Sequence, residues 1–313
     1  MILFASATAR KSGRNGFIVV AVLWILAALA TLASIYASYV ANTVVASRAN
    51  DERVQAQALI SAAVELAAYQ LTASSAQTRP THGAFNFRAG PANVAVEFRS
   101  EAARIDLNAA SKELLAGLFA ALGARPDVAQ GYADRIVGWR TNSREEGQAT
   151  GREASAYRTA GVAYDPREAP FVHVGELWLV MGIPPQLIER ALPYVTVYSG
   201  LAKINVLDAA PLALAALPGM TPERLNAVLN LRTVGQDGDQ VLQMLGPAQG
   251  GGTIEGSKAT RVRVTVNSDR GRRTIAAVVI LILEDADEPY RVLSWRDDAD
   301  GPLADEPPRT DLR

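Results

Sequence analysis

The sequence contains no cysteine and only two histidines, His82 and His173, in 313 residues. Without cysteine there can be no disulfide, thiolate zinc site, iron–sulfur cluster or cysteine nucleophile. Two histidines are too few for a zinc site, and neither lies near a nucleophile motif. No catalytic constellation that uses cysteine or histidine is therefore expected.

The chain also lacks an excess of charge of either sign. It has 31 lysines and arginines against 32 aspartates and glutamates, which gives a formal net charge of -1 at pH 7. This balance excludes a broadly basic nucleic-acid binder, although not a local basic patch. Hydrophobic residues make up 49% of the chain, which is normal for a protein that buries a core, and the length predicts about two domains.

Charge is absent from one long apolar run, residues 17–41, and the next charged residue is Arg48. At about 1.5 Å per residue a helix of this length reaches roughly 37 Å, enough to cross a hydrocarbon core of about 30 Å. The run is too long for a cleaved secretory signal. Because all the charged residues that precede it are basic, we expect a single membrane pass with the N-terminus in the cytoplasm and the bulk of the chain outside.

The helix is expected to continue beyond the membrane to about Thr72, because residues 42–72 contain neither glycine nor proline. Apolar residues at spacings of three and four predict a stripe on this stalk helix, formed by Val54, Ala58, Ala62, Leu66 and Tyr69. We expect the stripe to lie against a globular domain.

Strand patterns occur in two separate regions. Residues 84–88 and 93–99 alternate around a turn at Gly90 and predict a β-hairpin. Two β-branched runs in residues 260–285 flank a turn near Gly271, and residues 290–296 add a further strand. Alternation predicts one antiparallel sheet with one face on the stalk helix and the other in water.

The residues between these strand regions, 105–232, are helical by periodicity and too long for a loop, so we expect an inserted helical domain. This domain contains an internal repeat: RIDLNAA at 104–110 and KINVLDAA at 203–210, each followed by an apolar helical segment. Residues 176–199 are a third candidate unit.

The N-terminus resembles the class III leader of type IV pilins and pseudopilins, because a basic leader ends at Gly16 and Phe17 opens the apolar helix. An ordinary signal anchor is the alternative. The resemblance implies that prepilin peptidase cuts between Gly16 and Phe17 and methylates Phe17. Most members carry glutamate at the fifth position after the cut, where this chain has Ala21. Lack of that glutamate is a trait of protein K, a minor pseudopilin family of type II secretion.

Several internal segments are also similar to protein K: residues 104–108, 139–140, 170–183, 203–206 and 290–296. The family implies an α+β fold in which a pilin-like long N-terminal helix packs on an antiparallel sheet. A large helical domain of helical-hairpin or SAM-like repeats is inserted between the strands. The expected domains are a prepilin leader at 1–16, a transmembrane helix at 17–45, a pilin-like domain at 46–104 and 255–298, the inserted domain at 105–235, a Gly-rich loop at 236–254 and a flexible tail at 299–313.

The family often places an acidic cluster that binds calcium just after the tryptophan that matches Trp139. Here the calcium candidates that remain are Glu145, Glu146 and Glu153, and Arg144 and Arg152 lie close to them in the sequence. These cations argue against a calcium site. No other metal or cofactor is expected.

The resemblance implies a structural minor pseudopilin in the bacterial inner membrane, with a periplasmic C-terminal domain. Its implied partners are minor pseudopilins I and J, the major pseudopilin, the inner-membrane assembly platform and prepilin peptidase. Because Ala21 replaces the glutamate and the insert is bulky, we expect the chain to form or initiate the tip of the pseudopilus, which drives export of folded proteins across the outer membrane.

A membrane-anchored helix-hairpin-helix receptor for DNA uptake is the alternative function. In that module a Gly-x-Gly hairpin grips phosphates with its backbone amides. The matching turn here, residues 217–221, lacks the second glycine, and Glu223 follows where a cation would help. We therefore favour structural hairpins and expect no nucleic-acid partner.

Overall fold

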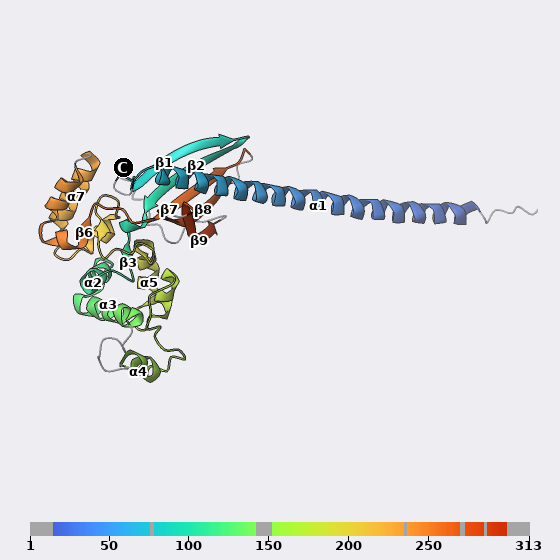
Figure 1. Cartoon of the computed structure of the whole chain (residues 1–313). Helices are drawn as coiled ribbons and strands as arrows, with labels where there is room; N and C mark the ends of the chain where they lie inside the picture. Colours follow the sequence, from blue (N-terminus) through green and yellow to red (C-terminus); the bar gives the residue numbers. More distant parts are fainter. Residues whose placement is uncertain are drawn as a thin grey trace, which may run out of the picture. The chain divides into compact units, whose positions relative to one another are not determined.

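The computed structural model describes residues 15–75, 78–141, 152–234, 237–269, 273–284 and 287–298. The chain divides into two compact units, residues 1–58 and 59–313. Helix α1 (Asn15–Thr72) provides the described part of the first unit and continues into the second (Figure 1). It ends at the predicted residue, Thr72.

The second unit contains a five-stranded antiparallel sheet in the order β1-β2-β7-β8-β9. Its strands are β1 (His82–Ala89), β2 (Ala92–Ser100), β7 (Ala259–Asn267), β8 (Arg273–Ile282) and β9 (Tyr290–Asp298). Both predicted hairpins are therefore confirmed. Strands β2 and β7 pair from Asn93 to Ser100, with Val96 opposite Val264, although more than 150 residues separate them in the sequence. The helical insert leaves the sheet after β2 and returns at β7.

One face of the sheet packs against residues 59–72 of α1, but through a different side of the helix from the predicted one. The buried residues of α1 are Ile60, Ala63, Val64, Ala67, Ala68 and Leu71. They pack with inward valines such as Val94, Val262 and Val264. Both sides of this alanine-rich helix carry apolar residues at spacings of three and four, so periodicity could not select between them. The side with small alanines allows the closer approach to the sheet.

The predicted stripe stays exposed instead. Leu66 and Tyr69 are 43% and 72% exposed, and Val54, in the first unit, is 59% exposed. Ala58 and Ala62 are exposed as well. The expectation that this stripe packs on the chain's own globular domain was wrong.

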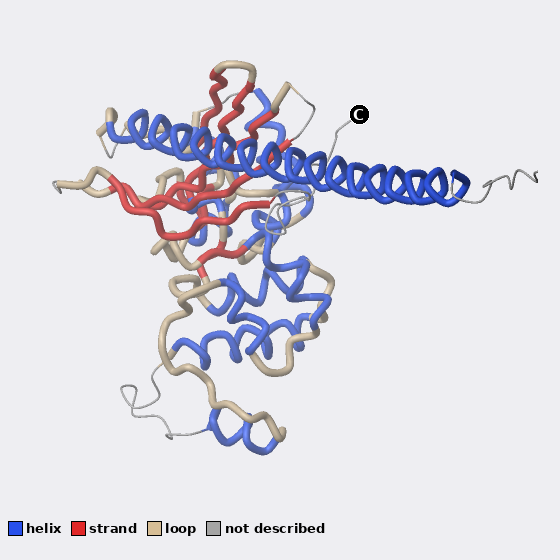
Figure 2. Tube along the Cα trace, turned by 90° about the vertical axis from the view of Figure 1, so that its right-hand side faces the viewer, coloured by secondary structure: helices blue, strands red, loops and turns tan. Residues whose placement is uncertain are grey.

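The insert is largely helical, as predicted (Figure 2). It has its own hydrophobic core. Its elements are η1 (Glu101–Ala103), β3 (Ile105–Asp106), α2 (Lys112–Ala121), α3 (Pro126–Arg140), α4 (Arg152–Thr159), η2 (Val174–Leu179), α5 (Pro185–Ala191), η3 (Leu192–Tyr194), β4 (Val195–Thr196), β5 (Ile204–Asn205), α6 (Pro211–Ala215), α7 (Pro222–Val234), α8 (Gly238–Met244), η4 (Gly246–Gly251) and β6 (Gly252–Thr253).

Residues 237–254, the described part of the Gly-rich segment 236–254, are not the predicted loop. They form α8, η4 and β6, and Val241, Leu245 and Ala248 are buried in the core of the insert. A Cβ added to Gly252 would lie 2.7 Å from Leu245 Cδ1 and 2.8 Å from Val206 Cγ1. At this position glycine allows close packing. The prediction was wrong because it took the glycines of this segment as a sign of a loop.

Candidate functional site

The internal repeat corresponds to two equivalent structural units within the insert. Each unit begins with a two-residue strand that pairs in parallel with a second strand at the end of the unit, β3 with β4 in the first and β5 with β6 in the second. In both units a tight turn then leads into a helix, α2 in the first and α6 in the second. The repeat in the sequence therefore marks a repeated fold element.

An arginine stabilises the turn of each unit. Arg140 Nη2 donates to Ala110 O at 2.7 Å, and Arg232 donates from Nε to Leu207 O and from Nη2 to Ala209 O, both at 2.7 Å. Burial lowers the pKa of Arg232 to about 10, although nearby Asp208 opposes this shift. Sequence analysis did not assign this role, because the arginines follow their turns at different distances.

Glu101 connects the insert to the sheet. Sequence analysis did not predict this role. Its side chain is 1% exposed, and its carboxylate accepts a 2.7 Å hydrogen bond from Arg261 Nε of β7 and another from Thr196 Oγ1 of β4. Burial raises the pKa of Glu101, but the positive charges of Arg261 and Arg104 outweigh it and leave the pKa below its usual value. A charged glutamate thus joins β2, β7 and the first unit of the insert.

A second contact links the start of β1 to the second unit of the insert. His82 Nδ1 lies 2.6 Å from Asp208 Oδ1, and the Asp208 side chain is only 3% exposed whereas that of His82 is 66% exposed. Glu101 and Asp208 therefore both connect the insert to the sheet. Both contacts join residues that are far apart in the sequence, so local sequence patterns did not predict them.

The predicted processing site lies in the N-terminal compact unit of the chain, residues 1–58, within α1. Gly16 belongs to the first turns of the helix, and Phe17 opens a candidate membrane span, Phe17–Thr43, with a mean hydropathy of 2.7. The most apolar part of this span is wholly unburied in the structure. Ala21 provides a methyl group where pilins place a carboxylate, so the described span contains no acidic side chain.

The predicted calcium candidates are only partly described. Glu145 and Glu146 lie outside the described residues, and Glu153 is in α4 without a described side chain. Within the described parts of the chain, no group of three or more histidines, aspartates or glutamates could hold a metal ion. Trp139 itself is 3% exposed, and its ring packs beside those of Tyr157 and Phe171. Calcium binding stays a prediction.

The turn of the hairpin that suggested DNA binding is exposed at Pro218 and Gly219 but contacts η4 of the insert. Gly219 takes a φ of +78°, and a Cβ added there would lie 3.5 Å from Pro247 of η4. Arg224, the cation closest in sequence to the turn, donates to Gly219 O at 3.1 Å. The contact with η4 and the internal use of Arg224 favour a structural hairpin.

Two comparisons with known proteins found matches to this chain. A family model described as type II secretion system (T2SS), protein K, matches residues 92–200, which run from β2 through the first unit of the insert. A chain of the crystal structure of the GspK-GspI-GspJ complex from the Type 2 Secretion System of enterotoxigenic Escherichia coli has a TM-score of 0.57 and 18% identity. The match covers 80% of this chain and 99% of that one. No curated protein matches the sequence.

Proposed function

We propose that this chain is a member of the protein K family of the type II secretion system, a structural minor pseudopilin and not an enzyme. The observation that carries the proposal is the family match over residues 92–200, which includes the point where the helical insert leaves the sheet. The shared fold supports it, because the structural match covers 80% of this chain and 99% of the chain from the GspK-GspI-GspJ complex.

We further propose minor pseudopilins I and J as partners, because the similar chain was crystallised in a GspK-GspI-GspJ complex. The exposed stripe on α1 supports contact through this helix. Leu66 and Tyr69 lie opposite the side that covers the sheet, and both remain in solvent in the isolated chain. Burying a large apolar side chain contributes about 1.5–3 kcal/mol, so packing of helices from several subunits would stabilise the assembly. The major pseudopilin and the assembly platform are the other proposed partners.

The chain's lack of cysteine allows a direct test of this contact. A Tyr69→Cys variant, labelled with a benzophenone maleimide and irradiated in native membranes, should form adducts with protein I or J. Gln70→Cys is the matched control, because it is exposed on the same helix but points about 100° away. Equal adduct yields from the two variants would argue against the stripe as the contact.

The proposed location follows from the membrane helix. We propose that prepilin peptidase cleaves between Gly16 and Phe17 and methylates Phe17, which leaves α1 as an anchor in the bacterial inner membrane. Before cleavage the basic leader would lie in the cytoplasm, and the sheet and insert would be periplasmic.

The proposed position is the tip of the pseudopilus. A glutamate in the membrane span costs several kcal/mol unless it is paired, so a subunit with no neighbour above it would gain nothing from a glutamate in place of Ala21. The insert adds bulk that subunits stacked in a shaft would have to accommodate. Immunogold labelling of isolated pseudopili should mark one end of each filament, and even labelling along the shaft would contradict this position.

A further inference from the structure

Strand β1 forms one edge of the sheet and has an open side. It stands first in the strand order, and among the strands of the described residues only β2 pairs with it. At the start of this hairpin Ser100 N donates to Thr81 O at 2.6 Å. Because the backbone groups of successive residues in a strand point to opposite sides, the odd-numbered residues of β1 bond to β2. The backbone N–H and C=O groups of Ala84, Asn86 and Arg88 therefore point outward, away from β2.

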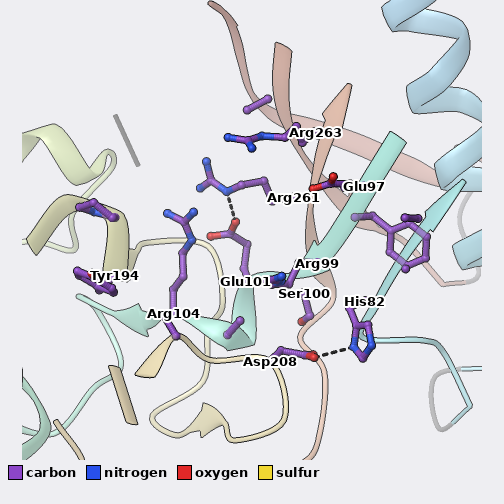
Figure 3. Close-up of a pocket in the computed structure, with 17 residues that line it drawn as sticks. His82, Glu97, Arg99, Ser100, Glu101, Arg104, Tyr194, Asp208, Arg261 and Arg263 are labelled. Atoms are coloured by element: carbon purple, nitrogen blue, oxygen red, sulfur yellow. Dashed lines mark hydrogen bonds and ion pairs between the residues drawn. The ribbon is translucent and has the colours of Figure 1, made fainter. Parts of the chain in front are cut away.

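This open edge is regular and already ordered. β1 pairs with β2 over all 8 of its residues without a register shift, and it contains no proline. At its first residue, His82 Nδ1 lies 2.6 Å from Asp208 Oδ1, which holds this end of the strand to the insert (Figure 3). An extended segment that pairs with β1 would therefore meet a preformed edge, which lowers the entropic cost of binding.

The opposite edge of the sheet, β9, carries features that protect an edge strand from further pairing. The register between β8 and β9 shifts at Val279 and Ile280. β9 also carries charged residues, Arg291, Arg296, Asp297 and Asp298. Bulges and charges both discourage an added strand. β1 has no such shift, and its arginine, Arg88, is next to last in the strand. The sheet therefore leaves β1, and not β9, open to a further strand.

An apolar surface lies beside the open edge, on the face of the sheet that α1 covers. Phe85 and Phe87 belong to this face, because they pair with Val96 and Val94 of the core. Their rings stack with centroids 6.5 Å apart, and both side chains are only partly buried. An apolar side chain placed next to β1 would bury the remaining surface of the two rings.

Helix α1 adds Leu59 and Leu66 to this apolar surface. The two leucines are seven residues apart and so lie on one flank of the helix. Glu65 lies about 100° from Leu66, across the exposed side of the helix, and accepts a 2.7 Å hydrogen bond from Tyr290 Oη of β9. Since the flank with Glu65 meets β9, the flank with the leucines turns toward β1. Leu66 is 43% exposed there.

We infer that β1 accepts an extended strand from the minor pseudopilin, I or J, that packs along the exposed stripe of α1. Leu66 belongs both to that stripe and to the apolar surface beside β1, so a subunit in contact with the stripe lies next to the open edge. Main-chain hydrogen bonds to Ala84, Asn86 and Arg88 would hold the added strand, and its apolar residues at alternate positions would pack on the two phenylalanines. This inference rests on the proposed partnership with proteins I and J and adds a second element to that contact.

The test is hydrogen–deuterium exchange of the full chain in detergent, alone and in complex with proteins I and J of the same organism. We expect the amides of Ala84, Asn86 and Arg88 to exchange at least about tenfold more slowly in the complex, because each becomes a donor to the added strand. The amides of β9 are the matched edge and should keep their rates. Unchanged rates at β1 within the complex would overturn this inference alone. Failure of the parent chain to form a complex would refute the proposed partners and the inference with them.

Asn86→Pro tests the backbone contact directly. It removes one outward N–H and places a ring in the path of the added strand, but it removes no hydrogen bond to β2, so it should weaken the complex at least about tenfold. Asn86→Thr is the matched control, because it replaces the same side chain and keeps the N–H. If Asn86→Pro unfolds, the exchange rates of the parent chain decide. Equal affinity of the two variants for proteins I and J would show that no strand is added to β1.

Discussion

The contact between the two units of the insert depends on Gly117 of α2. A Cβ added to this residue would lie 2.0 Å from Ala216 O and 2.8 Å from Ala216 C. Both are backbone atoms at the end of α6, so a rotamer change cannot relieve the clash. In Gly117→Ala the helices must move apart, although Leu118 and Leu214 beside them are fully buried. We expect a loss of about 3 kcal/mol, at the upper end of typical overpacking costs.

Gly131→Ala is the matched control for this substitution. Gly131 lies inside α3, and an added Cβ there meets nothing within 4 Å. Because alanine favours a helix over glycine by about 1 kcal/mol, this variant should be more stable than the parent chain.

The assay is thermal unfolding of the full chain in detergent, followed by tryptophan fluorescence. Trp139 and Trp178 lie in the insert and report on its packing. A change of 1 kcal/mol corresponds to a shift of about 2–4 °C for a domain of this size, so the two variants should differ by roughly 8 °C or more. A Gly117→Ala chain that melts with the parent would refute the close packing of α2 on α6.

Two further predictions concern the buried charges of the insert. Glu101→Gln should cost about 3 kcal/mol at neutral pH, because it leaves Arg261 without its buried carboxylate. Since the pKa of Glu101 is lowered in the folded state, its stabilisation is present above its unfolded pKa and is lost as pH falls through the folded pKa. In urea unfolding from pH 7 to 3, the free energy of unfolding of the parent chain should approach that of Glu101→Gln. A constant difference between the two chains would contradict the role of the Glu101 charge. Arg232→Met should cost about 2–3 kcal/mol in the same assay, because two buried carbonyls lose a charged donor, and an unchanged midpoint would mean that the turn does not need this arginine.

The sequence predicted those parts of the fold that depend on local signals. The length of α1 followed from a run without glycine or proline, and the hairpins followed from alternation around short turns. The insert was predicted because its helical periodicity separates two groups of strands. These features are encoded within stretches of about 10 to 60 residues.

The errors and omissions concern features that are determined by contacts between residues far apart in the sequence. Periodicity could not tell which side of α1 would meet the sheet, because the side with Leu66 and Tyr69 and the side with Val64 and Leu71 are both apolar. Gly252 looked like part of a loop until β6 was seen to pair with Ile204 and Asn205. Glu101 has no local motif, and its partners Thr196 and Arg261 follow it by 95 and 160 residues. No single-sequence signal identifies such a contact.

The N-terminus of the protein in native membranes is the most informative measurement for its assignment as a pseudopilin. Intact mass and N-terminal sequencing would be compared in cells with and without prepilin peptidase. We predict a mature chain that begins at methylated Phe17 only when the peptidase is present. A start at Met1 in both strains, or at a small residue beyond Ala27, would contradict processing as a pseudopilin.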